Sequence, residues 1–279
     1  MPYKTILVHC DDHRAMATRM EIATGLAERF QAHLVGLNAR PPFQPPAFSE
    51  GAYSMDLFFR DYETALNTGS AKAKEAFDAA VKGKEIATEW HSVDGRAEDL
   101  LTVHGRYADL TVVGQTDPDA TGLPLVSDLP ESVAVGTGRG TLVVPYVGTR
   151  APLGRNILLC WNASRESSRA ATEALPLLQG AASVTVLIVE PKSSPGGHGP
   201  QPGADVATWL SRHGVKVTVQ CDVAPDTDVG GVILSRAMDL GSDLIVMGIY
   251  GHSRMREMVL GGASRTLLSG MTVPVLMAH

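Results

Sequence analysis

The chain of 279 residues is long enough for two domains, and with 44% hydrophobic and 19% charged residues it can bury real cores. A net charge of −6 and the lack of a Lys/Arg-rich run argue against a nucleic-acid partner. No apolar stretch reaches the ~18–20 residues that cross a bilayer, and the first residues do not resemble a signal peptide, so we expect no membrane contact. Three cysteines outside CxxC spacing, Cys10, Cys160 and Cys221, favour a reducing compartment and hence the cytoplasm.

The first half opens on a strand-like run, Lys4–Asp12, that ends in polar residues. His9 and His13 flank two aspartates there and could ligate a metal, but a strand end followed by a helix start explains the same letters. Further on, Ala39–Tyr62 carries four prolines, and four aromatics follow from Tyr53 to Tyr62. We expect an ordered loop over a core or a dimer surface. A lid or a partner-docking arm is the alternative.

The second half of the chain repeats the first. Three pairs of segments match in the same order: Lys4–Asp12 with Arg155–Ser164, Ala108–Gly114 with Ser242–Gly248, and Thr141–Pro145 with Pro274–Ala278. The second pair has an offset of 134 residues. We therefore expect an N-terminal domain over 1–146, a linker over 147–154 and a C-terminal domain over 155–279.

Short apolar runs alternate with helical patterns in the second half. The expected strands are Arg155–Trp161, Val184–Val189, Val215–Cys221, Asp243–Gly248 and Val273–Ala278. The expected helices are Ser164–Gln179, Ala204–His213, Val229–Leu240 and Gly262–Leu268. The unbroken apolar runs are typical of parallel strands covered on both faces. We predict an α/β fold of two tandem doubly wound domains, each with a five-stranded, mostly parallel sheet flanked by helices. The last strand of each half should supply a pairing edge, with the halves related by a pseudo-twofold axis.

A glycine-spaced segment follows the fourth strand of the second half. Gly248 and Gly251 let the backbone turn and approach a ligand, and Gly261–Gly262 precede a helix whose free N–H groups suit a phosphate. Arg254 or Arg256, on an intervening mobile flap, could screen a polyphosphate. The alternative is that the glycines only end the strand and precede the helix, and that the arginines face solvent. The segment is neither a P-loop nor a dinucleotide fingerprint.

The pattern G-x2-G-x9-G, after a strand and before the last helix, resembles the universal stress protein family. Here it reads Gly248-x2-Gly251-x9-Gly261-Gly262-Ala263-Ser264, with the lead-in DLIVMG. The likeness covers both halves, so the chain is similar to tandem members in which two such domains pair. ATP-binding members hold adenosine between the first two strand ends and the phosphates in the glycine loop.

The resemblance implies an ATP site in the C-terminal domain. Asn162 would lie near the ribose or adenine and Val189 against the base, while the segments at 247–251 and 261–264 would surround the ribose and phosphates. With the adjoining positions, the site comprises Cys160, Asn162, Val189, Met247, Gly248, Gly251, Arg254, Gly261, Gly262, Ala263 and Ser264. Two departures weaken this expectation: the family's aspartate is Asn162 here, and Gly262 replaces a hydroxyl residue.

The first half differs at the same positions. At the offset of 134 residues, Gly251 corresponds to Asp117, and the segment Gly114–Gly138 holds four acids and no Lys or Arg. The acids are Asp117, Asp119, Asp128 and Glu131, and Pro118, Pro124 and Pro130 remove backbone donors. Yet Asp11 stands where the family's aspartate belongs. We expect the acids to repel a phosphate, so the N-terminal domain has a degenerate nucleotide loop.

The sequence thus favours a cytoplasmic stress-response protein that binds ATP or a related adenine nucleotide, with pairing of the two domains and a homodimer as a further arrangement. A ligand-independent interaction module with a vestigial loop is one alternative. A slow ATPase, or a protein autophosphorylated at Ser253 or Ser264, is another. We assign no catalytic or metal-binding residue. Ser164 should cap a helix, Cys160 should be a small buried residue, and Trp161 should serve packing or contact adenine.

Overall fold

The computed structural model describes residues 2–43, 52–119, 128–149, 152–190, 200–224, 228–249 and 262–279. Strands and helices alternate along both halves. The N-terminal half contains β1 (Thr5–His9), α1 (Met16–Phe30), β2 (His33–Arg40), α2 (Ala52–Val81), β3 (Thr88–Asp94), α3 (Ala97–Gly105), β4 (Leu110–Gly114), α4 (Leu129–Gly136) and β5 (Gly140–Val144). The C-terminal half contains β6 (Asn156–Cys160), α5 (Arg165–Glu173), α6 (Leu175–Gln179), β7 (Ser183–Val189), α7 (Ala204–Arg212), β8 (Val217–Asp222), α8 (Val229–Asp239), β9 (Leu244–Gly248), α9 (Gly262–Gly270) and β10 (Val275–Ala278).

The ten strands of the described residues form one sheet in the order β3-β2-β1-β4-β5-β10-β9-β6-β7-β8. Neighbours within each half are parallel. The chain builds outward from β6 to β8 and then resumes on the other side of β6 with β9, and the N-terminal half follows the same order. The predicted fold of two doubly wound, five-stranded units is therefore confirmed.

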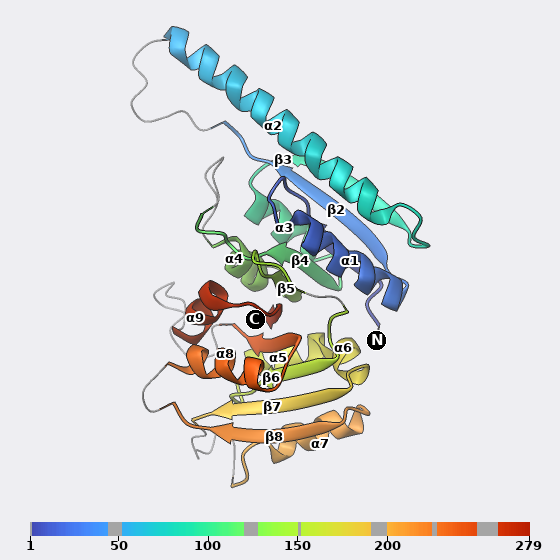
Figure 1. Cartoon of the computed structure of the whole chain (residues 1–279), viewed down its shortest axis with the longest axis vertical. Coiled ribbons are helices and arrows are strands. Elements are labelled where there is room, and N and C mark those ends of the chain that lie inside the picture. Colours follow the sequence, from blue (N-terminus) through green and yellow to red (C-terminus); the bar gives the residue numbers. More distant parts are fainter. Residues whose placement is uncertain are drawn as a thin grey trace.

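The two halves meet along β5 and β10, which pair antiparallel. Leu142 lies opposite Leu276, and Thr141 and Val143 lie opposite Met277 and Val275. Because the two leucines are equivalent in the repeat, this register maps onto itself when the halves are exchanged. The expected pairing through the last strands is observed, and it joins both halves into one sheet (Figure 1).

Helices cover both faces of the sheet, and each face has a core that spans both halves. On one face, α1, α2, α5, α6 and α7 bury residues such as Met20, Phe77 and Leu210. On the other face, α3, α4, α8 and α9 bury residues such as Leu101 and Ile233. The continuous cores leave the carboxyl ends of the strands as the place for a ligand in each half.

The proline- and aromatic-rich segment differs from the expected loop. Its second part belongs to α2, a helix of 30 residues whose first turns project beyond the rest of the chain (Figure 1). The chain before the helix packs back on it, since the ring of Phe43 contacts those of Phe59 and Tyr62. The Tyr62 hydroxyl donates to Pro41 O at 2.6 Å. Residues 44–51 lie outside the described part of the chain.

Other differences from the sequence-based elements are small. The helix expected over Ser164–Gln179 is two helices, α5 and α6, because Pro176 lacks the N–H that would continue the helix. Within the described ranges, no helix combines the length and apolar character required to cross a membrane.

Candidate functional site

The predicted nucleotide site of the C-terminal half lies at the point where the strand order switches. β6 pairs with β7 on one side and with β9 on the other, so the carboxyl ends of these three strands are neighbours. Asn162 follows β6, Val189 ends β7, and Met247 and Gly248 end β9. The topology thus brings the described strand-end residues of the prediction to one edge of the sheet.

The turn after β6 is built by local hydrogen bonds. Asn162 is exposed, and its Oδ1 accepts from the Ser164 N–H at 3.2 Å, with Ala163 at a φ of 59° between them. Ser164 Oγ then accepts from the Ser167 N–H at 3.2 Å, which confirms Ser164 as the N-cap of α5. Burial raises the pKa of the Cys160 thiol to about 12, so this cysteine is not a thiolate nucleophile at neutral pH.

Gly248 has a structural reason to be glycine that the sequence did not reveal. A Cβ built on it would lie 2.5 Å from the backbone carbon of Glu166 and 2.6 Å from the Ser167 nitrogen. The first turn of α5 therefore packs directly on the end of β9. Glu166 is buried there, and its carboxylate accepts a hydrogen bond from Arg165 Nε. Burial opposes its ionisation, but hydrogen bonds from Arg165, its own N–H and Ser164 lower its pKa.

The start of α9, predicted to hold the phosphates, is anchored on α8. The Thr266 hydroxyl donates to Asp228 Oδ2 at 3.1 Å, and Asp228 also caps α8 by accepting from the Gly231 N–H. Gly262 is exposed, whereas Ser264 is only 4% exposed. Gly251, Arg254 and Gly261, like the rest of 250–261, fall outside the described residues.

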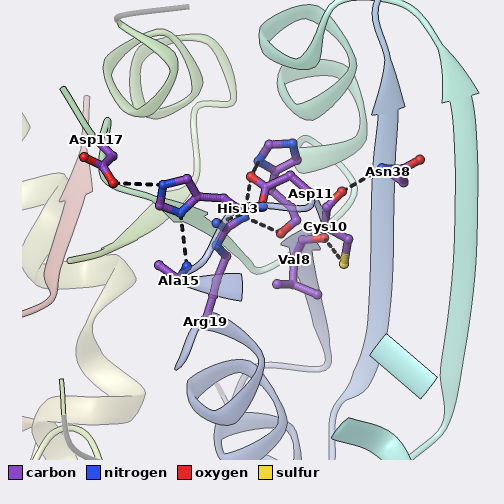
Figure 2. A network of polar contacts seen from close by, with 9 residues as sticks. Val8, Cys10, Asp11, His13, Ala15, Arg19, Asn38 and Asp117 are labelled. Carbon is purple, nitrogen blue, oxygen red and sulfur yellow. Dashed lines mark hydrogen bonds and ion pairs between the residues drawn. The ribbon is translucent and has the colours of Figure 1, made fainter. Parts of the chain in front are cut away.

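At the equivalent edge of the N-terminal half, charged side chains form a network of polar contacts (Figure 2). Arg19, on the buried face of α1, donates to His9 O at 2.7 Å and to Asp11 Oδ2 and Oδ1 at 3.0 and 3.2 Å. Burial opposes ionisation of Asp11, but Arg19, His9 and the hydrogen bonds outweigh it and lower its pKa to about 2. Burial lowers the pKa of His9 to about 4.

Asp117, the counterpart of Gly251, also has cationic and polar partners. His13 lies between two groups: its Nδ1 accepts from the Ala15 N–H at 3.1 Å, so its Nε2 donates to Asp117 Oδ2 at 3.1 Å. Arg14 lies 2.7 Å from the same carboxylate oxygen. Burial opposes ionisation of Asp117, but the hydrogen bonds from the Asp119 N–H, His13 and Arg14 lower its pKa.

These contacts change the physical reason expected for the difference between the halves. The sequence suggested that Asp117 and three further acids repel a phosphate, and Asp117 is paired with Arg14. Asp11, at the position of the family's aspartate, is paired with Arg19. The rings of His9 and His13 also lie against different aspartates, Asp11 and Asp117 respectively. Among the described residues, no group of three or more His, Cys, Asp or Glu side chains is arranged to hold a metal.

Residues 154–279 match the model of the Universal stress protein family. The C-terminal half is a universal stress protein domain. The whole chain has the same fold as a universal stress protein from Archaeoglobus fulgidus, at 14% identity, with 98% of this chain and 95% of that chain covered and a TM-score of 0.69. A putative universal stress protein from Pseudomonas aeruginosa is similar over 99% of this chain and 93% of its own, at 13% identity and a TM-score of 0.57.

A further solved universal stress protein, in complex with cAMP, resembles 52% of this chain over 98% of its own length, at 24% identity and a TM-score of 0.39. The curated proteins include no significant match to the chain.

Two residues at these strand ends, Arg19 and Glu166, were not predicted from the sequence. Arg19 stands among Met16, Met20 and Ala23, which all face the core, and a charged residue at such a position was a detectable signal. Glu166 gave no comparable signal, because an acid in the first turn of a helix is ordinary.

Proposed function

We propose that the C-terminal half binds an adenine nucleotide at the edge formed by β6, β7 and β9, and that the protein acts in the stress response in the cytoplasm. The observation that carries the proposal is the meeting of Asn162, Val189 and Gly248 at the switch point of a universal stress protein domain. The base would lie between the ends of β6 and β7, and the phosphates would lie toward the start of α9.

Several features support a nucleotide rather than another ligand. The spacing Gly248-x2-Gly251-x9-Gly261 is kept in this half, and Arg254 and Arg256 stand within it. The helix that follows, α9, is fixed on α8 and so presents its first N–H groups from a rigid element. Asn162 retains an amide that can donate to a ribose or base acceptor, because its Oδ1 is the atom engaged by Ser164.

The test is calorimetric titration of the full chain with ATP, and with cAMP as a second probe, in the parent and in Gly251→Asp. The substitution copies Asp117 of the N-terminal half and places a carboxylate at the proposed phosphate position, so binding should be lost. Gly25→Asp is the matched control, because Gly25 lies exposed on α1 with no atom near its side-chain position. Equal ATP affinity in the parent and in Gly251→Asp would show that the assigned site is wrong.

A further inference from the structure

The two halves can be compared residue by residue at the end of their first strands. β1 and β6 have the same register to their neighbours, with Ile6 and Ile157 opposite Leu110 and Leu244. In this alignment His9 corresponds to Cys160, Asp11 to Asn162 and Arg19 to Ala170. The turn is the same in both, because Asp11 Oδ1 accepts from the His13 N–H at 3.2 Å just as Asn162 Oδ1 accepts from Ser164.

Arg19 contacts the N-terminal counterparts of three predicted site residues. Its guanidinium binds His9 O and both oxygens of Asp11, and it lies 2.8 Å from a Cβ built on Gly114, the counterpart of Gly248. The side chain is 2% exposed. In the C-terminal half, Ala170 has no atoms that could make such contacts.

The contacts take up much of the acceptor capacity of Asp11, whose side chain is 30% exposed. Oδ1 accepts from the His13 N–H and from Arg19, and Oδ2 accepts from Arg19. His9 Nδ1 lies 3.5 Å from Oδ2 without a hydrogen bond. A nucleoside hydroxyl or amine at this strand end would compete with a buried guanidinium for Asp11. Displacing the guanidinium would leave that charge unpaired, which is strongly unfavourable.

We propose that Arg19 is the specificity-determining residue that closes the N-terminal half to adenine nucleosides by occupying Asp11 and the end of β1. This inference rests on the proposed function for its ligand class. It adds a physical occupant at the nucleoside position to the repulsion expected at the phosphate position. It identifies the difference between the halves at the nucleoside position as the pair Asp11 and Arg19 against Asn162 and Ala170.

The test is calorimetric titration of the full chain with adenosine, which lacks phosphates and so leaves Asp117 out of the comparison. Arg19→Ala combined with Asp11→Asn reproduces the pair found in the C-terminal half. The variant should bind one more adenosine per chain than the parent. If the parent binds none, the proposed function fails, yet a gain of one site would still support the role of Arg19. No gain in a folded variant would overturn it.

Two measurements separate closure from a merely structural role. Asp11→Asn alone keeps Arg19 in place and should gain no site, whereas a gain there would assign the closure to Asp11 and overturn the proposal. In the parent, which needs no substitution, saturating adenosine should leave the backbone amide resonances of Asp11 and Gly114 unshifted. A shift of both would show that the N-terminal half binds adenosine with Arg19 present, which contradicts the inference even if the double variant does not fold.

Discussion

At the residue scale, Asp11 and Asn162 illustrate how equivalent positions acquire different chemistry. Both accept an N–H two residues ahead at 3.2 Å, so the backbone turn requires only a side-chain oxygen. The carboxylate additionally holds Arg19, while the amide remains exposed. One half thus has an ion pair with a buried arginine at a strand end where the other half has an exposed amide.

His9 should make the stability of the protein sensitive to mild acid. The folded chain keeps this buried imidazole neutral down to a pKa of about 4, whereas the unfolded chain binds a proton below pH ~6.5. Acid therefore favours the unfolded chain, and His9 should remove about 2 kcal/mol of the free energy of unfolding between pH 7 and pH 5. Urea denaturation at both pH values measures this loss.

The variant His9→Asn isolates the contribution of His9, because it removes the titrating ring. Between pH 7 and pH 5, its free energy of unfolding should fall by about 2 kcal/mol less than that of the parent. His213→Asn, at an exposed position, is the control and should keep the parent's pH dependence. If His9→Asn and the parent lose equal stability on acidification, His9 is not held neutral by burial.

Local patterns predicted some of these residues and not others. Ser164 was predicted as an N-cap, because a hydroxyl before a helical run has one common role, and the hydrogen bond to Ser167 confirms it. The pairing of Arg19 with Asp11 was not predicted, since it depends on how α1 packs over β1. The role of Gly248 was missed for the same reason, because the approach of α5 is a tertiary contact.

At the scale of elements, α2 is the largest departure from expectation. Prolines and aromatics indicated a loop, but a helix extends from Ala52 to Val81, and its first turns project beyond the rest of the chain (Figure 1). Its C-terminal part is anchored by Phe77, which is 2% exposed and lies 5.3 Å from the ring of Trp90. Its projecting part exposes Leu57, Phe58 and Phe59. The buried contacts of Phe77 thus lie toward the C-terminal end of α2, while the projecting end of the helix exposes apolar side chains.

The same substitution should therefore lower the free energy of unfolding by very different amounts at the two ends of α2. Phe77→Ala removes a buried ring from the core and should lower the free energy of unfolding by about 3–5 kcal/mol. Phe58→Ala, at a ring that is 50% exposed on the same helix, should change it by about 0.5 kcal/mol or less. Urea denaturation of both variants compares them. Similar losses would mean that the projecting part of α2 is packed in solution.

At the scale of the whole molecule, the repeat accounts for both the fold and its symmetry. Matching apolar segments predicted two doubly wound units and their pairing strands, because parallel strands and crossovers leave few alternatives. The register of Leu142 opposite Leu276 makes the pairing symmetric. The candidate site was less predictable, since the closure of the N-terminal half depends on side chains that the motif does not include.

The central claim is that one half binds an adenine nucleotide and the other half is closed. Native mass spectrometry of the full chain with excess ATP tests it most directly, because it counts ligands and subunits together. The account predicts one nucleotide for each chain, whether the protein is a monomer or a dimer. Two nucleotides per chain, or none at saturating ATP, would contradict it.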